Sequence, residues 1–252
     1  MDRRLRSGLI VAAVLAAGGG LYYWQTRAPE NPPSGAAAPE AAGSHIEHPV
    51  APVAGTPLPA LADSDGAIAN AVAGLLRTAS LPELFYPDRI ARRWVATIDN
   101  LPREQVATEV RALRPPGGAL AVRGDEAALA IAPDNSARYA RYMTLLASVD
   151  VGQAAGLYRR FYPLLQEAYE ELGYPGQYFN DRVVTVIDHL LATPNVQEPI
   201  RLVHPSVMYK FADPKLESLS AGQKAMLRIG RENAAAVKAK LRAFRAEIVT
   251  TP

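Results

Sequence analysis

The sequence predicts a mainly α-helical protein in which one compact helical domain with a small β-hairpin follows a single transmembrane helix and a disordered linker. Three observations lead to this prediction. An uncharged apolar run stands near the N-terminus, a stretch rich in proline and alanine follows it, and apolar residues then recur at helical spacing. The chain accordingly divides into a cytoplasmic basic N-terminus (1–7), a transmembrane helix (8–24), a linker (25–63) and a helical periplasmic domain (64–252).

The composition excludes several classes of function. The chain has no cysteine, which excludes disulfides, thiolate metal sites and thiol catalysis. Its 27 basic and 25 acidic side chains give a net charge of +2, which provides no electrostatic basis for binding nucleic acid. The phosphate-binding pattern G-x-x-x-x-G-K-[ST] does not occur either. We therefore expect neither a cofactor, nor a metal, nor a nucleic-acid partner.

The apolar run from Gly8 to Trp24 has the properties of a signal anchor. At about 1.5 Å per residue it makes about 26 Å of helix, which is at the short end for a bilayer span. Three arginines before it and one after it predict a cytoplasmic N-terminus, and the aromatic residues that end it suit the far interface. Cleavage as a secretory signal is the alternative, because its central alanines are small. We favour retention in a bacterial inner membrane, since the run continues past these alanines.

The stretch from Ala28 to Asp63 has the composition of a spacer. It holds eight prolines, with alanine and glycine in most of the gaps. Such a segment buries too little apolar surface to offset the entropy lost on ordering, so we expect it to stay solvated and partly in polyproline II. It would hold the folded domain away from the membrane.

The folded domain opens with helices that carry recognisable start signals. Ser64 or Asp65 caps a first helix, and Pro87 with Asp88 opens a second, in which apolar residues recur at helical spacing. Pro102 stands at a first-turn position and predicts a third helix, which ends at a Pro-Pro-Gly-Gly sequence. We therefore expect three helices before the hairpin.

A short hairpin and further helices follow. Apolar residues alternate on both sides of Arg123-Gly-Asp, which we interpret as the hairpin turn. A long amphipathic helix ends at Gly173, and Asn180 or Asp181 caps the next one. After two short extended segments a pair of helices closes the domain, the last from about Glu232 to Glu247.

Several strings in the domain resemble a known bacterial family. They are Phe161-Tyr-Pro-Leu-Leu-Gln-Glu-Ala-Tyr, Tyr178-Phe-Asn-Asp-Arg, Ile187-Asp-His-Leu-Leu-Ala-Thr-Pro, Tyr209-Lys-Phe-Ala-Asp-Pro and Leu219-Ser-Ala-Gly-Gln-Lys. The family consists of single-pass proteobacterial envelope proteins that carry a domain of unknown function, and the resemblance covers roughly Leu75 to Phe244. It implies an exported, membrane-tethered, mainly helical domain and supplies no catalytic residues.

Aromatic side chains concentrate between Tyr158 and Phe179, beside two arginines. Tyrosine and arginine are the residue types that anchor interfaces, and tyrosine also stacks on sugars. We interpret most of this set as the core of two packed helices. The leading hypothesis is nevertheless a non-enzymatic binding or scaffolding module of the cell envelope, in which a groove is lined by Tyr162, Tyr169, Tyr174, Tyr178, Phe179, Arg182 and His189. Its partner would be an envelope protein, with a cell-wall polymer as the second candidate.

The alternative hypothesis is an envelope hydrolase or cell-wall-modifying enzyme that uses Asp181, Asp188 and His189. These residues lie on or near one helical face, but Asp188 and His189 are adjacent and point about 100° apart. The zinc-binding spacing H-E-x-x-H is absent. An enzyme therefore requires these three side chains to converge in a concave pocket with shifted pKa values.

Two further patterns lie in the C-terminal part of the sequence. Ser220 followed three residues later by Gln223 predicts a helix capping box rather than the signature loop of a transport ATPase. The last helix carries a basic stripe, which consists of Arg231, Lys238, Arg242 and Arg245. We interpret this stripe as a solvated face, and contact with anionic lipid is the third hypothesis.

Overall fold

The fold is taken from a computed structural model of the chain, which describes residues 45–51, 53, 55, 57–77, 81–205 and 208–249. The predicted transmembrane helix (8–24) and the first part of the linker lie outside these residues. Within the described ranges, no helix combines the length and apolar character that a membrane span needs.

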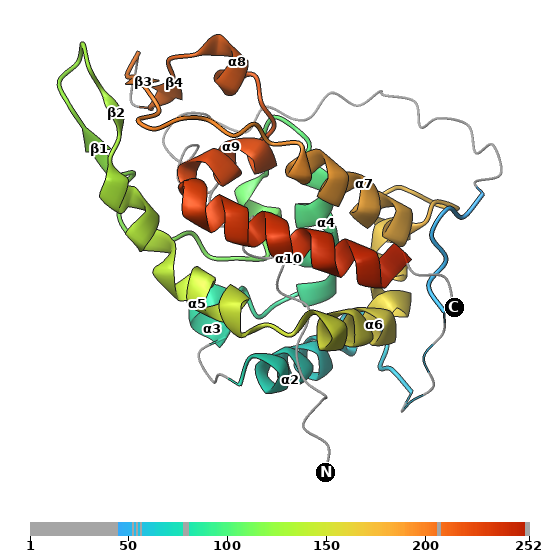
Figure 1. The fold of residues 1–252 in the computed structure, drawn as a ribbon. Helices are drawn as coiled ribbons and strands as arrows, with labels where there is room; N and C mark the ends of the chain where they lie inside the picture. Colours follow the sequence, from blue (N-terminus) through green and yellow to red (C-terminus); the bar gives the residue numbers. More distant parts are fainter. Residues whose placement is uncertain are drawn as a thin grey trace.

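Helices make up the body of the described chain, as predicted (Figure 1). The long ones are α2 (Asp65–Leu76), α4 (Ile90–Asn100), α6 (Val151–Glu171), α7 (Phe179–Leu191) and α10 (Arg231–Val249). Helices α6 and α7 lie between α4 and α10, since each of the latter contacts both, and α2 packs on α4 and α6. The main hydrophobic core fills the space between these helices.

Short helices connect the long ones. They are α3 (Leu81–Leu84), α5 (Ala140–Ser148), α8 (Pro214–Glu217), α9 (Ala221–Arg228) and the 3₁₀ turns η1 (Leu61–Asp63), η2 (Thr108–Val110) and η3 (Pro133–Tyr139). The capping box predicted from Ser220 and Gln223 is present at the start of α9.

The packed part of the chain begins earlier than the boundary drawn at residue 64. Leu61 in η1 is buried in the main core, and Val50 and Leu58 pack against it. These apolar side chains stand among prolines and alanines, so the composition of the segment conceals them. Residues 45–51, blue in Figure 1, lie beside α6 and α7.

A small β lobe stands at one end of the molecule, away from α2 (Figure 1). The predicted hairpin is confirmed as β1 (Val122–Arg123) paired with β2 (Ala130–Ile131), and a second hairpin pairs β3 (Leu202–Val203) with β4 (Lys210–Phe211). The Leu202 amide donates to the Leu129 carbonyl over 2.9 Å, which joins the two hairpins. The lobe has its own hydrophobic cluster, separate from the main core.

The Arg123-Gly-Asp sequence forms the turn that was predicted. Gly124 has a φ of +89°, and a Cβ there would lie 2.5 Å from the Ala128 carbonyl oxygen. The Asp125 carboxylate accepts a hydrogen bond from the Ala128 amide over 3.0 Å. The tripeptide is therefore accounted for by turn chemistry.

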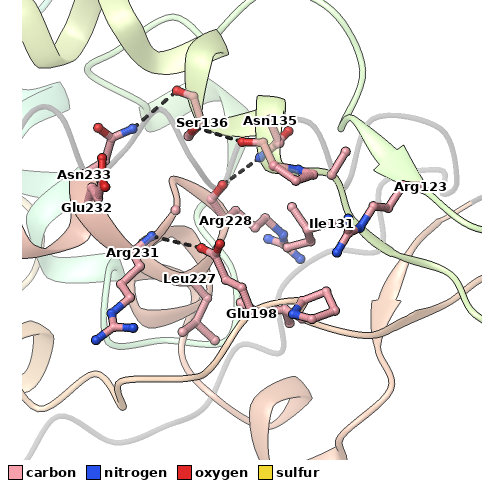
Figure 2. Close-up of a pocket in the computed structure, with 15 residues that line it drawn as sticks. Arg123, Ile131, Asn135, Ser136, Glu198, Leu227, Arg228, Arg231, Glu232 and Asn233 are labelled. Carbon is pink, nitrogen blue, oxygen red and sulfur yellow. Dashed lines mark hydrogen bonds between the residues drawn. The ribbon is translucent and has the colours of Figure 1, made fainter.

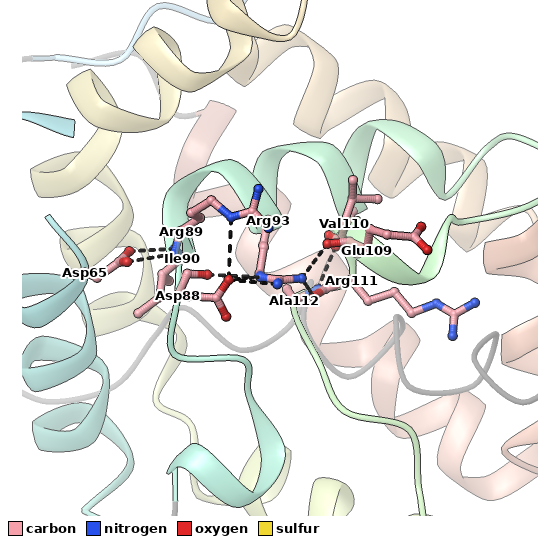
Figure 3. A network of polar contacts seen from close by, with 10 residues as sticks. Asp65, Asp88, Arg89, Ile90, Arg93, Glu109, Val110, Arg111 and Ala112 are labelled. Atoms are coloured by element: carbon pink, nitrogen blue, oxygen red, sulfur yellow. Dashed lines mark hydrogen bonds and ion pairs between the residues drawn. The ribbon is translucent and has the colours of Figure 1, made fainter. Parts of the chain in front are cut away.

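The third helix predicted from Pro102 does not form, and this segment contains only the single turn η2. The backbone groups of this segment form hydrogen bonds with side chains of α4 instead. Thr97 donates to the Val110 carbonyl and accepts from the Ala112 amide. Arg93 donates to the carbonyls of Glu109 and Arg111 (Figure 3). These tertiary bonds to α4 outweigh the local helical periodicity.

Candidate functional site

The aromatic residues proposed for a groove lie mainly inside the protein. Phe179 has an exposed fraction of 0% and Tyr169 of 2%. The Tyr169 ring stacks on Tyr174, with 4.6 Å between ring centroids, and it also contacts Phe179. Tyr162 is half-buried, its hydroxyl donates to Gln166, and burial raises its pKa to about 12. Tyr178 is half-buried at the residue before α7. These side chains therefore lie where α6 meets α7, the inner ones buried and the outer ones half-buried.

Arg182 and Tyr174 both bind a buried carboxylate that no sequence pattern singles out. The Asp99 side chain is 1% exposed, and Arg182 Nε donates to it over 2.8 Å. Arg103 donates to its other oxygen over 2.7 Å, and the Tyr174 hydroxyl lies 3.2 Å from that same atom. A carboxylate in an amphipathic helix is usually solvated, so no local signal distinguishes Asp99. This network joins α4, α7 and the turns between them.

Asp181 holds the segment that precedes the folded domain. Its carboxylate accepts from the amides of Glu47 and His48 over 3.2 and 2.8 Å. The neighbouring Asn180 is fully buried and donates to the His48 carbonyl over 2.8 Å. Neither residue caps α7 as predicted, because that helix begins at Phe179 without a side-chain cap. Both side chains bind the backbone of the N-terminal segment instead.

We expect Asp181→Ala to release residues 45–51 from the surface of α7. Each hydrogen bond from an amide to a carboxylate contributes about 1.5–3 kcal/mol, so amide exchange at Glu47 and His48 should quicken about tenfold or more. Hydrogen–deuterium exchange with mass spectrometry measures this change. Asp188→Ala, on the same helix, is the matched control and should leave exchange in this segment unchanged. Equal exchange in both variants and wild type would show that Asp181 does not hold the segment.

The three residues of the enzyme hypothesis have separate partners. Asp181 binds the N-terminal segment, and Asp188 forms a two-pronged ion pair with Arg245 of α10 at 2.7 and 2.8 Å. His189 Nε2 lies 2.8 Å from the hydroxyl of Ser220, the residue that caps α9. Each side chain thus attaches α7 to a different neighbouring segment, and the structure does not bring the three together around a common point.

The basic stripe of α10 is also divided between roles. Lys238 is buried and donates to the Thr193 carbonyl over 2.5 Å, and Arg245 is engaged by Asp188. Arg242 is exposed, whereas Arg231 lies at the first turn of the helix, on the wall of a cavity. Two of the four side chains of the basic stripe, Lys238 and Arg245, therefore make contacts within the protein.

His189 should make stability depend on pH. Burial lowers the pKa of His189, and the nearby Arg182 guanidinium lowers it further. The unfolded chain then takes up this proton first, near pH 6.5, so the free energy of unfolding should fall as the pH drops from about 7.5 to about 5.5. His189→Gln should reduce this fall, which urea titrations at the two pH values measure. A variant that shows the full wild-type fall would place the titrating group elsewhere.

A cavity of about 330 Å³ lies where the β lobe meets the helical body (Figure 2). Residues of β1, β2, η3, the end of α9 and the start of α10 line it, together with the Glu198–Ile200 segment. Arg123, Arg228 and Arg231 stand on its walls, and Glu198 and Glu232 supply the carboxylates. Small-molecule sites favour such junctions between packed units.

Hydrogen bonds fix the polar wall of this cavity. Asn135, which is 1% exposed, donates to the Arg228 carbonyl over 2.7 Å, and Asn233 donates to the Ser136 carbonyl over 3.3 Å (Figure 2). Gly230 makes the turn from α9 to α10 with a φ of +89°, and a Cβ there would lie 3.0 Å from Ser136. A side chain at this position would be strained and crowded, so glycine lets α10 begin directly at the cavity.

This cavity could not be predicted from the sequence. Arg123 belongs to the turn tripeptide and Arg231 to the basic stripe, and these residues are more than a hundred positions apart in the chain. No local pattern places them on one cavity. A weak signal was available in the uneven charge around the junction of the last two helices, where Arg228 and Arg231 lie close together.

A family model described as "Protein of unknown function (DUF3014)" matches residues 90–245, which is more than half of the chain. The chain belongs to this family. The resemblance to a family defined by a domain of unknown function is thereby confirmed, and the DUF3014 match runs from α4 into α10, so it includes the β lobe and the cavity. No curated protein and no solved structure matches the chain.

Proposed function

We propose that this DUF3014 chain is a membrane-anchored binding or scaffolding module of the bacterial cell envelope. Residues 8–24 would anchor it in the inner membrane with a cytoplasmic N-terminus, and the helical domain would bind an envelope partner in the periplasm. The observation that carries the binding role is the cavity of about 330 Å³ with its three arginines. Its volume lies at the lower end of the range for ligand sites, and its polar wall is held in place by hydrogen bonds.

The contacts of Asp181, Asp188 and His189 support binding over the alternative of a hydrolase. A hydrolase needs its acid, base and nucleophile within hydrogen-bonding reach of one reacting group. In this chain Asp188 is engaged by Arg245, and Asp181 by two backbone amides. Using either for catalysis would require breaking a contact that holds α7 in place.

Site-specific photocrosslinking in cells tests the binding role. A photoreactive residue at Ser136 stands on the cavity wall, and the same residue at Glu167, exposed on α6, is the matched control. We expect the full-length protein to give a discrete adduct from position 136 that position 167 does not give. A protein adduct would identify a scaffold partner and a glycan adduct a wall ligand. Identical products from both positions would contradict a binding role for the cavity.

Membrane extraction tests the anchor. A chain retained through residues 8–24 should stay in the pellet after alkaline carbonate treatment, and its N-terminus should begin at residue 1 or 2. Introducing two arginines into the run should release the protein, because each charge at the centre of a span costs about 2.5–3.5 kcal/mol. A mature N-terminus beyond residue 17 would show instead that the segment is a cleaved signal.

A further inference from the structure

We infer that the cavity between the β lobe and the helical body binds the carboxylate of a short peptide, held between Arg123 and Arg228. This inference rests on the proposed binding function and specifies its ligand. It follows from the charges on the cavity wall, the burial of Arg228, the position of Glu198 and the size of the space.

Arginines from three separate segments meet at this cavity. Arg123 comes from β1, Arg228 ends α9 and Arg231 begins α10. In Figure 2 the side chains of Arg123 and Arg228 extend toward one another from opposite walls. Within the described part of the chain, neither Arg123 nor Arg231 forms an ion pair. A carboxylate has two oxygens, so one carboxylate can accept from guanidinium groups on both walls, in charge-assisted hydrogen bonds that are stronger than neutral ones.

Arg228 provides a fixed and largely desolvated side of the site. Its exposed fraction is 9%, and its guanidinium lies 5.1 Å from the centre of the Phe211 ring in the core of the β lobe. Its backbone carbonyl is held by Asn135 over 2.7 Å. A guanidinium that is already positioned loses little entropy on binding, and partial burial strengthens its attraction for an anion. Arg123, exposed on the strand opposite, can close on the ligand from the other side.

Glu198 determines which kind of anion fits. Its carboxylate accepts from the Arg231 amide at the first turn of α10 over 3.4 Å, so a carboxylate already occupies part of this positive region. With the carboxylates of Glu198 and Glu232 on the same wall, the cavity suits a single carboxylate better than a doubly charged phosphate. Glu198 also offers an acceptor for an ammonium or amide N–H of the same ligand. A carboxylate beside an N–H donor is the chemistry of a peptide.

The size of the cavity and its apolar walls agree with this ligand. About 330 Å³ is close to the smallest volume typical of ligand sites, so it suits one or two residues rather than an extended chain. Ile131, Pro199 and Leu227 contribute apolar surface beside the charged groups. These side chains would contact the methylene groups of the bound residue while the arginines hold its carboxylate.

Calorimetric titration of the full-length chain in detergent tests the inference. The probe is the dipeptide Ala-Gln, which carries a single carboxylate, with its C-terminal amide (the diamide) and inorganic phosphate as comparisons. We expect the dipeptide to bind, its diamide to bind at least tenfold more weakly, and Arg123→Gln to weaken the dipeptide about tenfold or more. Arg242→Gln, the same change at an exposed position of α10 away from the cavity, should bind as wild type does.

The results separate the inference from the proposed function. Failure of the dipeptide to bind, equal binding by the diamide or by phosphate, or full affinity in Arg123→Gln would overturn the carboxylate site. If the cavity still gave a specific crosslink from Ser136 in cells, only the ligand class would be wrong; if it gave none, the binding function would fail as well. Repeating the titration with L-Ala-D-Gln identifies the source, since a wall peptide contains D-residues and a protein segment does not.

Discussion

Replacing Asp99 with alanine is expected to lower the free energy of unfolding by about 3–5 kcal/mol, a large part of the roughly 5–15 kcal/mol that stabilises a typical folded domain. The carboxylate is 1% exposed and accepts hydrogen bonds from Arg182 and Arg103, while Tyr174 donates to it as well. Alanine would leave the guanidinium of Arg182, whose side chain is 26% exposed, without its counter-charge. The loss arises mainly from this unpaired cation rather than from the net strength of the ion pair.

Urea unfolding of the full-length chain, followed by circular dichroism, measures this loss. Glu171→Ala is the matched control, because Glu171 also pairs with an arginine, Arg92, but with both side chains more than a third exposed. Exposed ion pairs contribute about 0–1 kcal/mol to the free energy of unfolding, so the control variant should lose little stability. If Asp99→Ala lost no more stability than Glu171→Ala, water would be solvating Arg182. The Asp99 network would then not hold α4 against α7.

The helices could be predicted because their signals are local. Apolar spacing indicates α4, α7 and α10, and the capping box at Ser220 and Gln223 marks the start of α9 within a residue. Alternation around Arg123-Gly-Asp likewise predicts the first hairpin. Each of these features depends on residues a few positions apart, for which the periodicity and capping rules apply directly.

What could not be predicted depends on contacts between distant residues. Asp99 meets Arg182 across 83 positions, and Asp181 meets His48 across 133. The helix expected after Pro102 is lost because Thr97 and Arg93 bind its backbone. The same holds for the cavity, whose arginines come from three segments that only the fold brings together.

Phe179→Ala should lower the free energy of unfolding by about 3–5 kcal/mol, because it removes a ring with an exposed fraction of 0% from the centre of the core. The ring contacts Tyr169, and α7 begins at this residue, so its loss leaves a cavity where α7 meets α6. The interpretation of Phe179 as a groove residue predicts the opposite pattern, with little effect on stability and a large effect on binding.

Tyr178, the aromatic residue next to Phe179, provides the matched control for this prediction. Tyr178 is half-buried just before α7, and Tyr178→Ala should cost about 1 kcal/mol, as a partly exposed substitution usually does. Urea midpoints of the two variants, measured on the full-length chain, give the difference. Equal losses would mean that the α6–α7 joint tolerates the cavity at Phe179 by collapsing around it. A larger loss at Tyr178 would contradict the packing of α7 on α6, because the more exposed residue would then make the contact that the buried one is expected to make.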